Sequence, residues 1–431
     1  MELVVFWFRR DLRWEDNKGL EAALKEGKSI LPLFIYDTQI LDELPVDDAR
    51  LNFIHESLYA MNEQLKEQGS CMVFRKGKPK KVWEQLVQEY TIAAVYTNKD
   101  YEPYARIRDK EVMDVLEAAG IPLIRVKDQV IFEEREVMKK DGTPYTVYTP
   151  YKKVWLKQFD PAAYKPTGLP DFGQFWKGEA PFLSLEDIGF EPSTIKVRPF
   201  DLGGLKDYAE IRDLPAEDGT SYLSPHLRFG IVSPRQIIAE LDVKANATFL
   251  SELIWREFFM QILYHFPKVV EHNFRAKYDG IEWRNNKDEF ERWCQGQTGY
   301  PMVDAGMRQL NETGYMHNRV RMITASFLCK HLLIDWRWGE AYFAQKLLDY
   351  ELSSNNGNWQ WAAGTGCDAS PYFRVFNPIT QLDKFDKERH YVKRWIKDLG
   401  KASYPEPIVE HKSARLRAIE RYKEGIQAVQ Q

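Results

Sequence analysis

Cysteine is scarce in this sequence. Only four of the 431 residues are cysteine, no two of them form a CxxC pair, and no histidine cluster lies beside them. Such scattered cysteines disfavour a disulfide framework and a zinc site, so we expect no bound metal and a reducing compartment. The four residues are Cys71, Cys294, Cys329 and Cys367.

Long apolar runs and a signal peptide are also missing. No stretch reaches the ~18 consecutive apolar residues that a membrane-spanning helix needs. The first apolar run, residues 3–8, is short, and an arginine pair follows it, whereas a signal peptide carries its positive charge before the run. We therefore expect a cytoplasmic protein with no membrane-spanning helix.

Neither sign of charge is in excess. The 60 Lys and Arg residues against 64 Asp and Glu give a net charge of −4. Composition alone therefore does not indicate a nucleic-acid-binding protein, although a local basic patch can still bind phosphate. The hydrophobic fraction of 44% and the charged fraction of 29% are typical of a globular chain, and the length predicts two or three domains. Tryptophan is frequent, with 13 residues, and needs an explanation.

The first 130 residues alternate short β-type runs with amphipathic stretches. This alternation predicts βαβ units and a doubly wound parallel sheet. No GxGxxG fingerprint follows the first run. Residues 8–17, FRRDLRWEDN, stand there instead, and they are either a charged turn or the wall of a ligand crevice at the carboxyl ends of the strands. The expected strands are 3–8, 30–36, 71–76, 93–98 and 121–126, and the expected helices lie near 50–68, 81–90 and 105–119.

The rest of the chain changes character twice. Residues 131–200 are rich in proline and poor in periodicity, which predicts a long connector between domains. From about residue 201 apolar residues recur at i, i+3 and i+4, which predicts helices. We therefore expect an α/β domain over 1–130, a connector over 131–200 and a helical domain over 201–431. The clearest expected helices are 232–241, 247–266, 317–335 and 339–349.

Two short motifs in the second half can be interpreted chemically or structurally. Residues 219–230, GTSYLSPHLRFG, place hydroxyl groups before an expected helix, which suits a pyrophosphate but is also the usual composition of an N-cap. In HNRVRM, Asn318 and Met322 share a helix face. That face can line a pocket for a flat heteroaromatic ring or belong to an ordinary amphipathic helix.

The most informative stretch is NNGNWQWAAGTG, residues 355–366. Its Gly and Asn residues predict a loop, and Asn355 lies four residues ahead of Trp359. Arg374 follows among aromatic residues. This composition is typical of a surface that stacks bases and contacts phosphate. A buried aromatic loop with Arg374 as a cation–π partner is the structural alternative.

Taken in order, these segments resemble the DNA photolyase/cryptochrome family, most closely its class I cyclobutane-pyrimidine-dimer photolyases. The resemblance implies a Rossmann-like α/β domain followed by an all-α domain that binds FAD. It also implies a carbon–carbon lyase: excited, reduced, anionic FAD passes an electron to a flipped-out dimer in UV-damaged DNA, the cyclobutane splits, and the electron returns. The matching segments are 6–13, 141–155, 219–230, 252–259, 298–310, 314–328 and 355–378.

The resemblance implies two groups of FAD-binding residues. One group surrounds the phosphates and the other lies around the isoalloxazine and ribose, where Arg321 and Asp349 form an ion pair. The phosphate group is Tyr208, Thr220, Ser221 and Ser224. The ring and ribose group is Arg256, Asn318, Arg321, Asp349 and Asn355.

A further set is implied for DNA. Trp255 and Trp361 are expected as stacking walls, and Glu252 as the hydrogen-bond partner of a thymine edge. Phosphate contacts make the affinity fall with salt. The residues that face the dimer are Glu252, Trp255, Asn318, Met322 and Trp361, and those that hold flanking phosphates are Arg212, Arg319 and Arg374.

The resemblance also implies an electron relay, which would explain part of the tryptophan excess. Trp359, Trp336 and Trp283 match the family's three-Trp path from flavin to surface, which reduces oxidised FAD. Packing is the alternative for each residue. It accounts well for Trp336 and poorly for Trp283, because Trp283 has polar neighbours in the sequence.

Single positions separate the branches of the family. The (6-4) photolyases carry His where Asn318 stands, and plant-type cryptochromes carry Asp at the position of Asn355, where an amide cannot readily protonate the flavin. A monomeric repair enzyme is favoured, and a cryptochrome-type blue-light photoreceptor without repair activity is the alternative. Folate-binding members use an Asn-Glu pair where Tyr104 and Ala105 stand, which disfavours a folate antenna. A deazaflavin, a second flavin or no antenna remain open.

Overall fold

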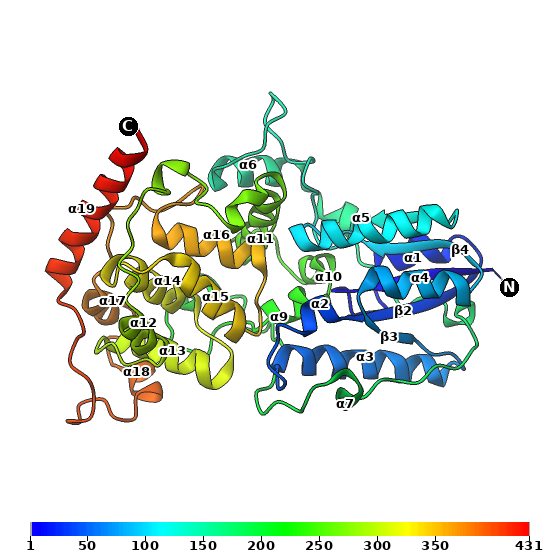
Figure 1. Ribbon diagram of the computed structural model, residues 1–431, viewed down its shortest axis with the longest axis horizontal. Helices are drawn as coiled ribbons and strands as arrows, with labels where there is room; N and C mark the ends of the chain where they lie inside the picture. The colour runs from blue at the N-terminus through cyan, green and yellow to red at the C-terminus, as the bar shows by residue number, and fades with distance from the viewer. Residues whose placement is uncertain (1, 431) are drawn as a thin grey trace. The chain divides into compact units, whose positions relative to one another are not determined.

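The computed structural model describes residues 2–430, which form two compact units (Figure 1). The units interleave along the chain, which differs from the three consecutive segments expected from the sequence. Part of the expected connector, Met138–Val154, belongs to the second unit, and the remainder of 131–200 belongs to the first. The first unit comprises the chain up to Val137 with Trp155–Phe200 and Tyr222–Lys244, and the second comprises Met138–Val154, Asp201–Ser221 and the chain from Ala245 onward.

The first unit contains a five-stranded, entirely parallel sheet, as the alternating pattern predicts. Its strand order is β3-β2-β1-β4-β5, so the order reverses between β1 and β4. Crevices at such reversals lie outside the carboxyl ends of the strands. The strands are β1 (Leu3–Phe8), β2 (Ser29–Asp37), β3 (Val73–Gly77), β4 (Ile92–Asn98) and β5 (Leu123–Val126).

Both faces of this sheet are covered by helices, which explains why β1 is apolar at every position. Leu3, Val5 and Trp7 lie in one apolar cluster, and Val4 and Phe6 lie in another on the opposite face. Side chains alternate between the faces of a strand, so a continuous apolar run identifies a strand buried on both sides.

The helices of the first unit begin with recognisable signals. The Asn17 side chain accepts a hydrogen bond at the start of α1, Asp48 does so at the start of α3, and proline opens α4 and α5. The helices are α1 (Lys18–Leu24), α2 (Thr38–Leu41), α3 (Ala49–Glu67), α4 (Pro79–Glu89), α5 (Pro103–Ala118), α7 (Leu185–Ile188), α9 (Ser224–Arg228) and α10 (Pro234–Ala239), and α6 (Tyr148–Gln158) begins in the second unit and ends in the first.

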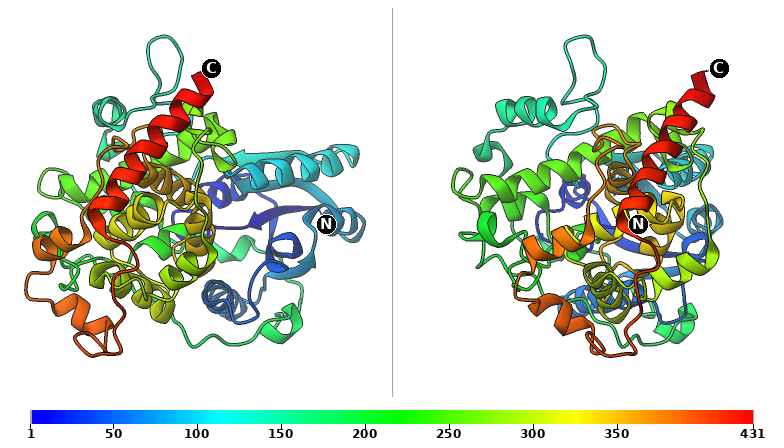
Figure 2. Two further views of the ribbon diagram at one scale, coloured as in Figure 1. Left: turned by 60° about the vertical axis from the view of Figure 1, so that its left-hand side comes forward. Right: turned by 90° about the vertical axis from the view of Figure 1, so that its left-hand side faces the viewer.

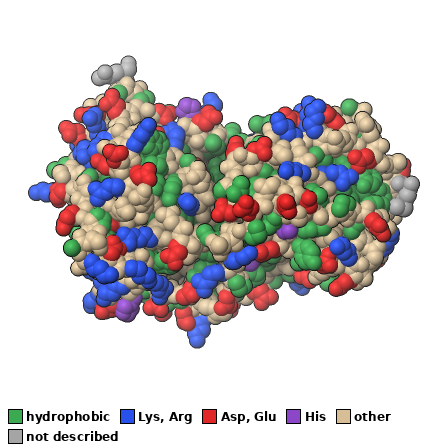
Figure 3. Space-filling view, turned by 60° about the horizontal axis from the view of Figure 1, so that its bottom comes forward, with side chains coloured by type: hydrophobic (Ala, Val, Ile, Leu, Met, Phe, Trp, Pro, Cys, Tyr) green, Lys and Arg blue, Asp and Glu red, His purple; other side chains and the backbone are tan. Residues whose placement is uncertain are grey.

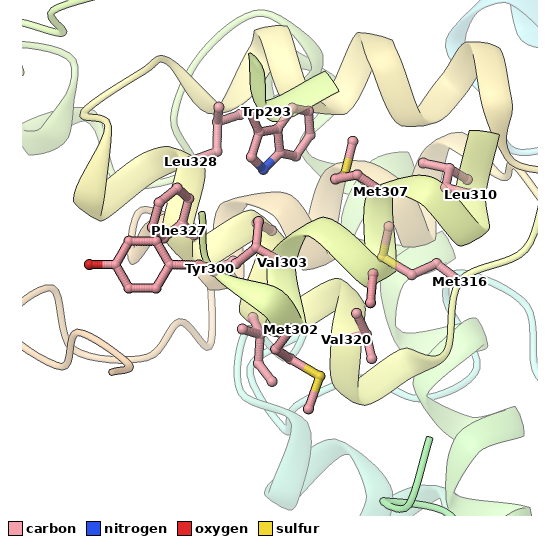
Figure 4. Packing of buried hydrophobic residues seen from close by; sticks show 14 of the residues in the cluster. Trp293, Tyr300, Met302, Val303, Met307, Leu310, Met316, Val320, Phe327 and Leu328 are labelled. Atoms are coloured by element: carbon pink, nitrogen blue, oxygen red, sulfur yellow. The ribbon is translucent and has the colours of Figure 1, made fainter. Parts of the chain in front are cut away.

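The second unit is helical and has a large apolar core (Figure 4). Met302 and Val303 of α13 pack in one cluster with Val320 of α14 and Trp293 of α12, and all four side chains are fully buried. The helices are α8 (Tyr208–Ile211), α11 (Ala247–His265), α12 (Lys287–Cys294), α13 (Pro301–Thr313), α14 (Asn318–Ser326), α15 (Trp336–Lys346), α16 (Leu352–Ala363), α17 (Pro378–Phe385), α18 (His390–Trp395) and α19 (His411–Gln430).

The loop expected over 355–366 is wrong, because most of that stretch is helix α16. Its glycine serves close packing instead of a turn. A Cβ atom on Gly357 would lie 2.1 Å from a ring carbon of Phe259 on α11, and one on Gly339 of α15 would lie 2.1 Å from the Trp359 ring. Helix α16 thus packs tightly between α11 and α15, and small residues at these two positions allow it.

Two other elements bear on the site. The helix expected over 317–335 is shorter, because α14 ends at Ser326 and a π-helical turn, Phe327–His331, follows it. Helix α19 lies on the outside of the helical unit (Figure 2) and packs against this π-helical turn. Over residues 2–430 no helix is long and apolar enough to cross a membrane. The same residues contain no group of three or more His, Cys, Asp or Glu side chains placed to hold a metal ion.

Candidate cofactor and DNA-binding site

Polar side chains gather around the start of α16, the central helix of the second unit. Helices α11, α14 and α15 all pack against α16. Asp349 and Glu351 precede the helix and Asn355 lies in its first turns, and each of these side chains is less than a tenth exposed. Buried polar groups are costly unless they are hydrogen-bonded. Their concentration here therefore identifies a site within the apolar core.

Two ion pairs fix the cations of this site. The Arg321 guanidinium lies 2.9 Å from Asp349 Oδ2, as the resemblance implies, and its Nε donates to the Met316 carbonyl at 2.8 Å. Arg256 of α11 lies 3.3 Å from the Glu351 carboxylate. Sequence reasoning did not single out Glu351. The Glu351 carboxylate holds the Arg256 side chain toward α16, because a buried charge requires a partner.

Asn355 is bound by a residue that the sequence did not reveal. Its amide Nδ2 donates to the Glu340 carboxyl at 2.8 Å and to the Glu340 backbone carbonyl at 3.1 Å. Burial raises the pKa of Glu340, although this hydrogen bond lowers it in part. Because both amide hydrogens point to Glu340, the Asn355 Oδ1 oxygen is oriented away from that residue and can accept a hydrogen bond from a ligand.

Two buried atoms beside these residues lack a hydrogen bond to any described residue. They are the Ser353 hydroxyl oxygen, at the start of α16, and the His317 Nε2 nitrogen, at the start of α14. Unsatisfied polar atoms in a buried region point to a missing polar partner. A guanidinium–carboxylate pair, an amide and these two atoms suit a flat ring with several nitrogen and oxygen atoms, so the residues present fit a flavin.

The expected DNA contacts Arg212 and Glu252 bind each other. The Arg212 guanidinium donates to Glu252 at 2.5 Å, and both side chains are partly exposed. Burial by itself lowers the pKa of Arg212, but Glu252 and its other neighbours more than offset this, so the pKa is raised. Arg319 is similarly held by Asp213 at 2.8 Å. These arginines are charged and oriented by acids on neighbouring segments.

The residues expected to face the dimer lie on helices α11, α14 and α16. Trp255 and Glu252 are on α11, Asn318 and Met322 are on α14, and Trp361 is on α16. Asn318 is exposed, and Trp255, Met322 and Trp361 are half-buried. These positions are accessible to a ligand, which a core position would not be.

One face of Trp255 is covered by a residue that sequence reasoning missed. The Tyr148 ring of α6 stacks on it with a centroid distance of 3.5 Å and an angle of 8° between the planes. Tyr148 lies in the segment 141–155, which carries part of the family resemblance but gave no sign of this contact. The Trp255 side chain as a whole is half-buried, so only part of its surface stays accessible to a ligand.

The remaining expected residues are more scattered. Tyr208 packs edge-on against Phe249 at 5.1 Å, and burial raises its pKa to about 12. Thr220 and Ser221 belong to the second unit and Ser224, the first residue of α9, to the first. Their joint contact with a phosphate stays a prediction. Arg374 is exposed in the loop after α16, with its guanidinium 5.6 Å from the Phe376 ring.

The three tryptophans of the expected relay lie in one region. Trp359 and Trp336 are buried in the same apolar cluster, and Trp283 packs against it while half-exposed. Trp336 Nε1 donates to Asn273 at 2.9 Å, so this indole is firmly held. A path from core to surface is consistent with these positions, and electron transfer along it stays a prediction.

The segment 8–17 of the first unit is a buried charge network. Arg13 pairs with Asp128 at 2.6 Å and Arg10 donates to Glu102 at 3.0 Å. Burial by itself raises the pKa of Asp100, but Arg10 and other arginines nearby lower it to about 2. Tyr104 donates a hydrogen bond to Asp37. A ligand crevice at these carboxyl ends of the strands stays a prediction.

Family models match both halves of the chain. Residues 4–170 match the model described as DNA photolyase, and residues 249–403 match the FAD binding domain of DNA photolyase. The chain belongs to the DNA photolyase family. The cluster around α16 lies within the residues that match this FAD-binding domain.

Several members of the photolyase family are similar to this chain over nearly its full length. The deoxyribodipyrimidine photo-lyase of Synechococcus sp. is 38% identical over 95% of this chain and 94% of its own. A bacterial class III photolyase from Agrobacterium tumefaciens matches with a TM-score of 0.88 and 35% identity, over 99% of this chain and 98% of that one. An archaeal photolyase from Sulfolobus tokodaii with two FAD molecules matches with a TM-score of 0.85 and 35% identity, over 98% of this chain and 100% of that one.

Proposed function

We propose that this protein is a deoxyribodipyrimidine photo-lyase, which uses light and reduced FAD to split cyclobutane pyrimidine dimers in DNA. Membership of the photolyase family supports this. The observation that carries the proposal is that one helical unit joins two kinds of surface. It has a buried polar cluster around α16 that fits a flavin, and half-exposed aromatic and cationic residues on α11, α14 and α16.

The flavin would be held through its polar edges. Asn355 and the Arg321–Asp349 pair are the groups we assign to the isoalloxazine, with Arg256 and Asn318 nearby. When bound and reduced, FAD supplies the excited-state electron that the cyclobutane needs. The neutral amide of Asn355 keeps an acid away from the ring, and the Glu340 carboxyl holds that amide in a fixed orientation.

The DNA would be held by the exposed residues. A dimer is easier to flip out of the helix than an intact pair, because its stacking and pairing are already weakened. Trp255, Trp361 and Met322 would then exclude water around it, while Glu252 accepts a hydrogen bond from the thymine edge. Arg212 would have to share or release Glu252 when DNA binds, because these two side chains are paired at 2.5 Å.

A blue-light photoreceptor without repair activity is the second candidate. The solved relatives named above are photolyases, and Asn355 carries no acidic proton for a flavin. Asn318 also disfavours (6-4) repair, because no imidazole stands there to donate a proton to the lesion. Asn318 is exposed, so a lesion can reach this position.

Three further features belong to the proposal. We propose a monomer, located in the cytoplasm, where it reaches the cell's DNA. We also propose that a second chromophore, if bound, is not a folate, because Tyr104 takes the place of an amide and donates to Asp37. The subclass, class I in our interpretation, stays a prediction, since the Agrobacterium relative is of class III.

The test compares lesions. Purified protein with chemically reduced flavin is illuminated with oligonucleotides that carry one cyclobutane thymine dimer or one (6-4) photoproduct. We expect restoration of the cyclobutane substrate only. Repair of the (6-4) substrate would overturn the lesion assignment, and binding of FAD with repair of neither would favour the photoreceptor.

A further inference from the structure

Tyr148 contacts three residues of the second unit, and one of them, Trp255, belongs to the proposed DNA site. Its ring stacks on Trp255 at 3.5 Å, its hydroxyl group lies 2.6 Å from the Ser251 hydroxyl and 2.8 Å from the Ser251 carbonyl, and its backbone N–H donates to Asp368 at 3.0 Å. The Phe258 and Phe259 rings also contact the Trp255 ring, but both are farther away and less parallel to it than the Tyr148 ring.

The contact fixes the Trp255 ring. Tyr148 is only 7% exposed, and the planes of the two rings differ by 8°. The Phe259 ring lies one helical turn further, at 5.5 Å and 25°. A half-buried indole without such neighbours would populate several rotamers and would lose that freedom on binding. The stack removes this cost in advance, which is the usual effect of preorganisation on affinity.

The backbone contact fixes a loop as well. Tyr148 is the first residue of α6, and its N–H is one of the groups that a helix leaves unsatisfied at its start. The Asp368 carboxylate accepts this N–H and places a negative charge at the positive end of the helix, which is favourable. Asp368 lies in the loop after α16, six residues before Arg374.

The start of α6 therefore holds two surfaces expected to touch DNA. The chain before it is a projecting loop with little secondary structure (Figure 2). Lys152, one turn after Tyr148, also donates to the Ser251 hydroxyl at 3.0 Å. The position of Tyr148 is thus set by contacts on α11 and on the 364–377 loop, and these contacts in turn set the position of Trp255.

The geometry points to Tyr148 as a positioning residue that holds Trp255 and the 364–377 loop in the form that recognises a flipped dimer. The inference rests on the proposed function. Tyr148 acts through Trp255 and Asp368 and takes no part in the photochemistry. Its loss should therefore lower the selectivity for damaged DNA and leave the light-driven step unchanged once DNA is bound.

The experiment measures two dissociation constants for each variant, one for an oligonucleotide with a thymine dimer and one for the undamaged oligonucleotide. Tyr148→Leu removes the ring, Tyr148→Phe keeps it, and Asp368→Ala removes the loop contact. Tyr151→Leu is the matched control, because Tyr151 lies on α6, is also buried and packs on Phe258 instead of Trp255.

We expect Tyr148→Leu to lose about tenfold in affinity for dimer-containing DNA, within the range for one stacking contact, with affinity for undamaged DNA unchanged. Tyr148→Phe should keep most of the selectivity, and the repair rate at saturating DNA should stay at the wild-type value in both. The affinity of Asp368→Ala for dimer-containing DNA should fall less, by about threefold, because the ring stack remains.

Two results would overturn the inference. One is unchanged selectivity in Tyr148→Leu, and the other is an equal loss in Tyr151→Leu, which would show a general effect of α6 packing. If Tyr148→Leu does not fold, unchanged selectivity in Asp368→Ala overturns it. Wild-type protein that neither selects nor repairs dimers would instead contradict the proposed function itself.

Discussion

The Glu340 carboxyl of α15 accepts the Asn355 amide of α16 at 2.8 Å, and burial raises the pKa of that carboxyl. Asn355 is itself only 9% exposed. A neutral amide thus stands between a buried acid and the side of α16 that we assign to the flavin. A single substitution at position 355 would therefore place a proton donor beside the flavin.

Asn355→Asp should change the protonation of the reduced flavin. Two carboxyl groups at hydrogen-bond distance cannot both ionise in a buried site, so one of the pair at 340 and 355 will keep its proton at neutral pH. Illumination should then yield the neutral, protonated one-electron form of the flavin, seen in the absorption spectrum. Asn355→Gln is the control without an acid. If the spectra of the Asp variant are identical to those of the wild type, Asn355 does not lie beside the flavin.

Trp255→Ala should weaken binding to dimer-containing DNA by about 1–3 kcal/mol, the value of one stacking contact. Trp255 is half-buried on α11 and Glu252 lies one turn away. FAD content should stay at the wild-type level, because Trp255 is not among the residues that we assign to the flavin. Gel-shift titration of damaged and undamaged DNA measures the effect. Equal loss for both DNAs would contradict a role in lesion recognition.

Trp283→Phe should slow or abolish the light-driven reduction of oxidised flavin by an external donor. Trp283 is the half-exposed member of the three and touches the Tyr422 ring at 5.8 Å. Repair by chemically reduced enzyme should be unaffected, because the dimer receives its electron from the flavin. Trp338→Phe is a matched control, since Trp338 is half-buried on α15 and outside the relay. Normal photoreduction in Trp283→Phe would remove this residue from the path.

His317 should make the protein less stable in mild acid. Burial lowers its pKa from 6.5 to about 4, and its Nδ1 accepts the Arg319 N–H at 3.2 Å at the start of α14. The unfolded chain therefore takes up a proton at a pH where the folded chain does not, so stability is lost as pH falls from about 6.5 toward 4. At pH 5 this amounts to about 2 kcal/mol.

The check uses His317→Asn, because Asn also caps a helix but does not titrate. Urea unfolding at pH 7 and pH 5 gives the free energy of unfolding of each protein. We expect a smaller difference between the two pH values in the variant. An equal difference in both proteins would show that His317 is not the group responsible.

The sequence predicted the α/β unit well because β1, β2 and β4 are largely apolar runs bounded by clear turns and caps. A strand buried on both faces has few alternatives at that length. The ion pair of Arg321 with Asp349 also followed from the family resemblance, and the structure places these residues at 2.9 Å.

Helix α16 could not be predicted in the same way. Its Asn and Gly residues have low helix propensity, and only tertiary contacts explain them: Gly357 lets Phe259 approach, and Asn356 donates to the Val269 carbonyl at 3.0 Å. Glu340 and Tyr148 were missed for a related reason. Each acts through a partner far away in the chain, and no local spacing indicates such a contact.

The amino-acid composition also did not reveal where charged side chains gather on the surface. The chain is slightly acidic as a whole, yet Figure 3 shows Lys and Arg side chains gathered in places, notably at the lower left. Local patches of this kind govern phosphate binding, while the net charge averages over the molecule.

The most direct test of the account is a light-dependence measurement on a thymine-dimer oligonucleotide. The protein, with its FAD chemically reduced, is mixed with this DNA, and recovery of thymine absorbance is followed in blue light and in darkness. The account predicts recovery in light, none in darkness, and none in light when an undamaged oligonucleotide replaces the substrate. No recovery in light, with FAD bound, fully reduced and the DNA in the complex, would contradict it.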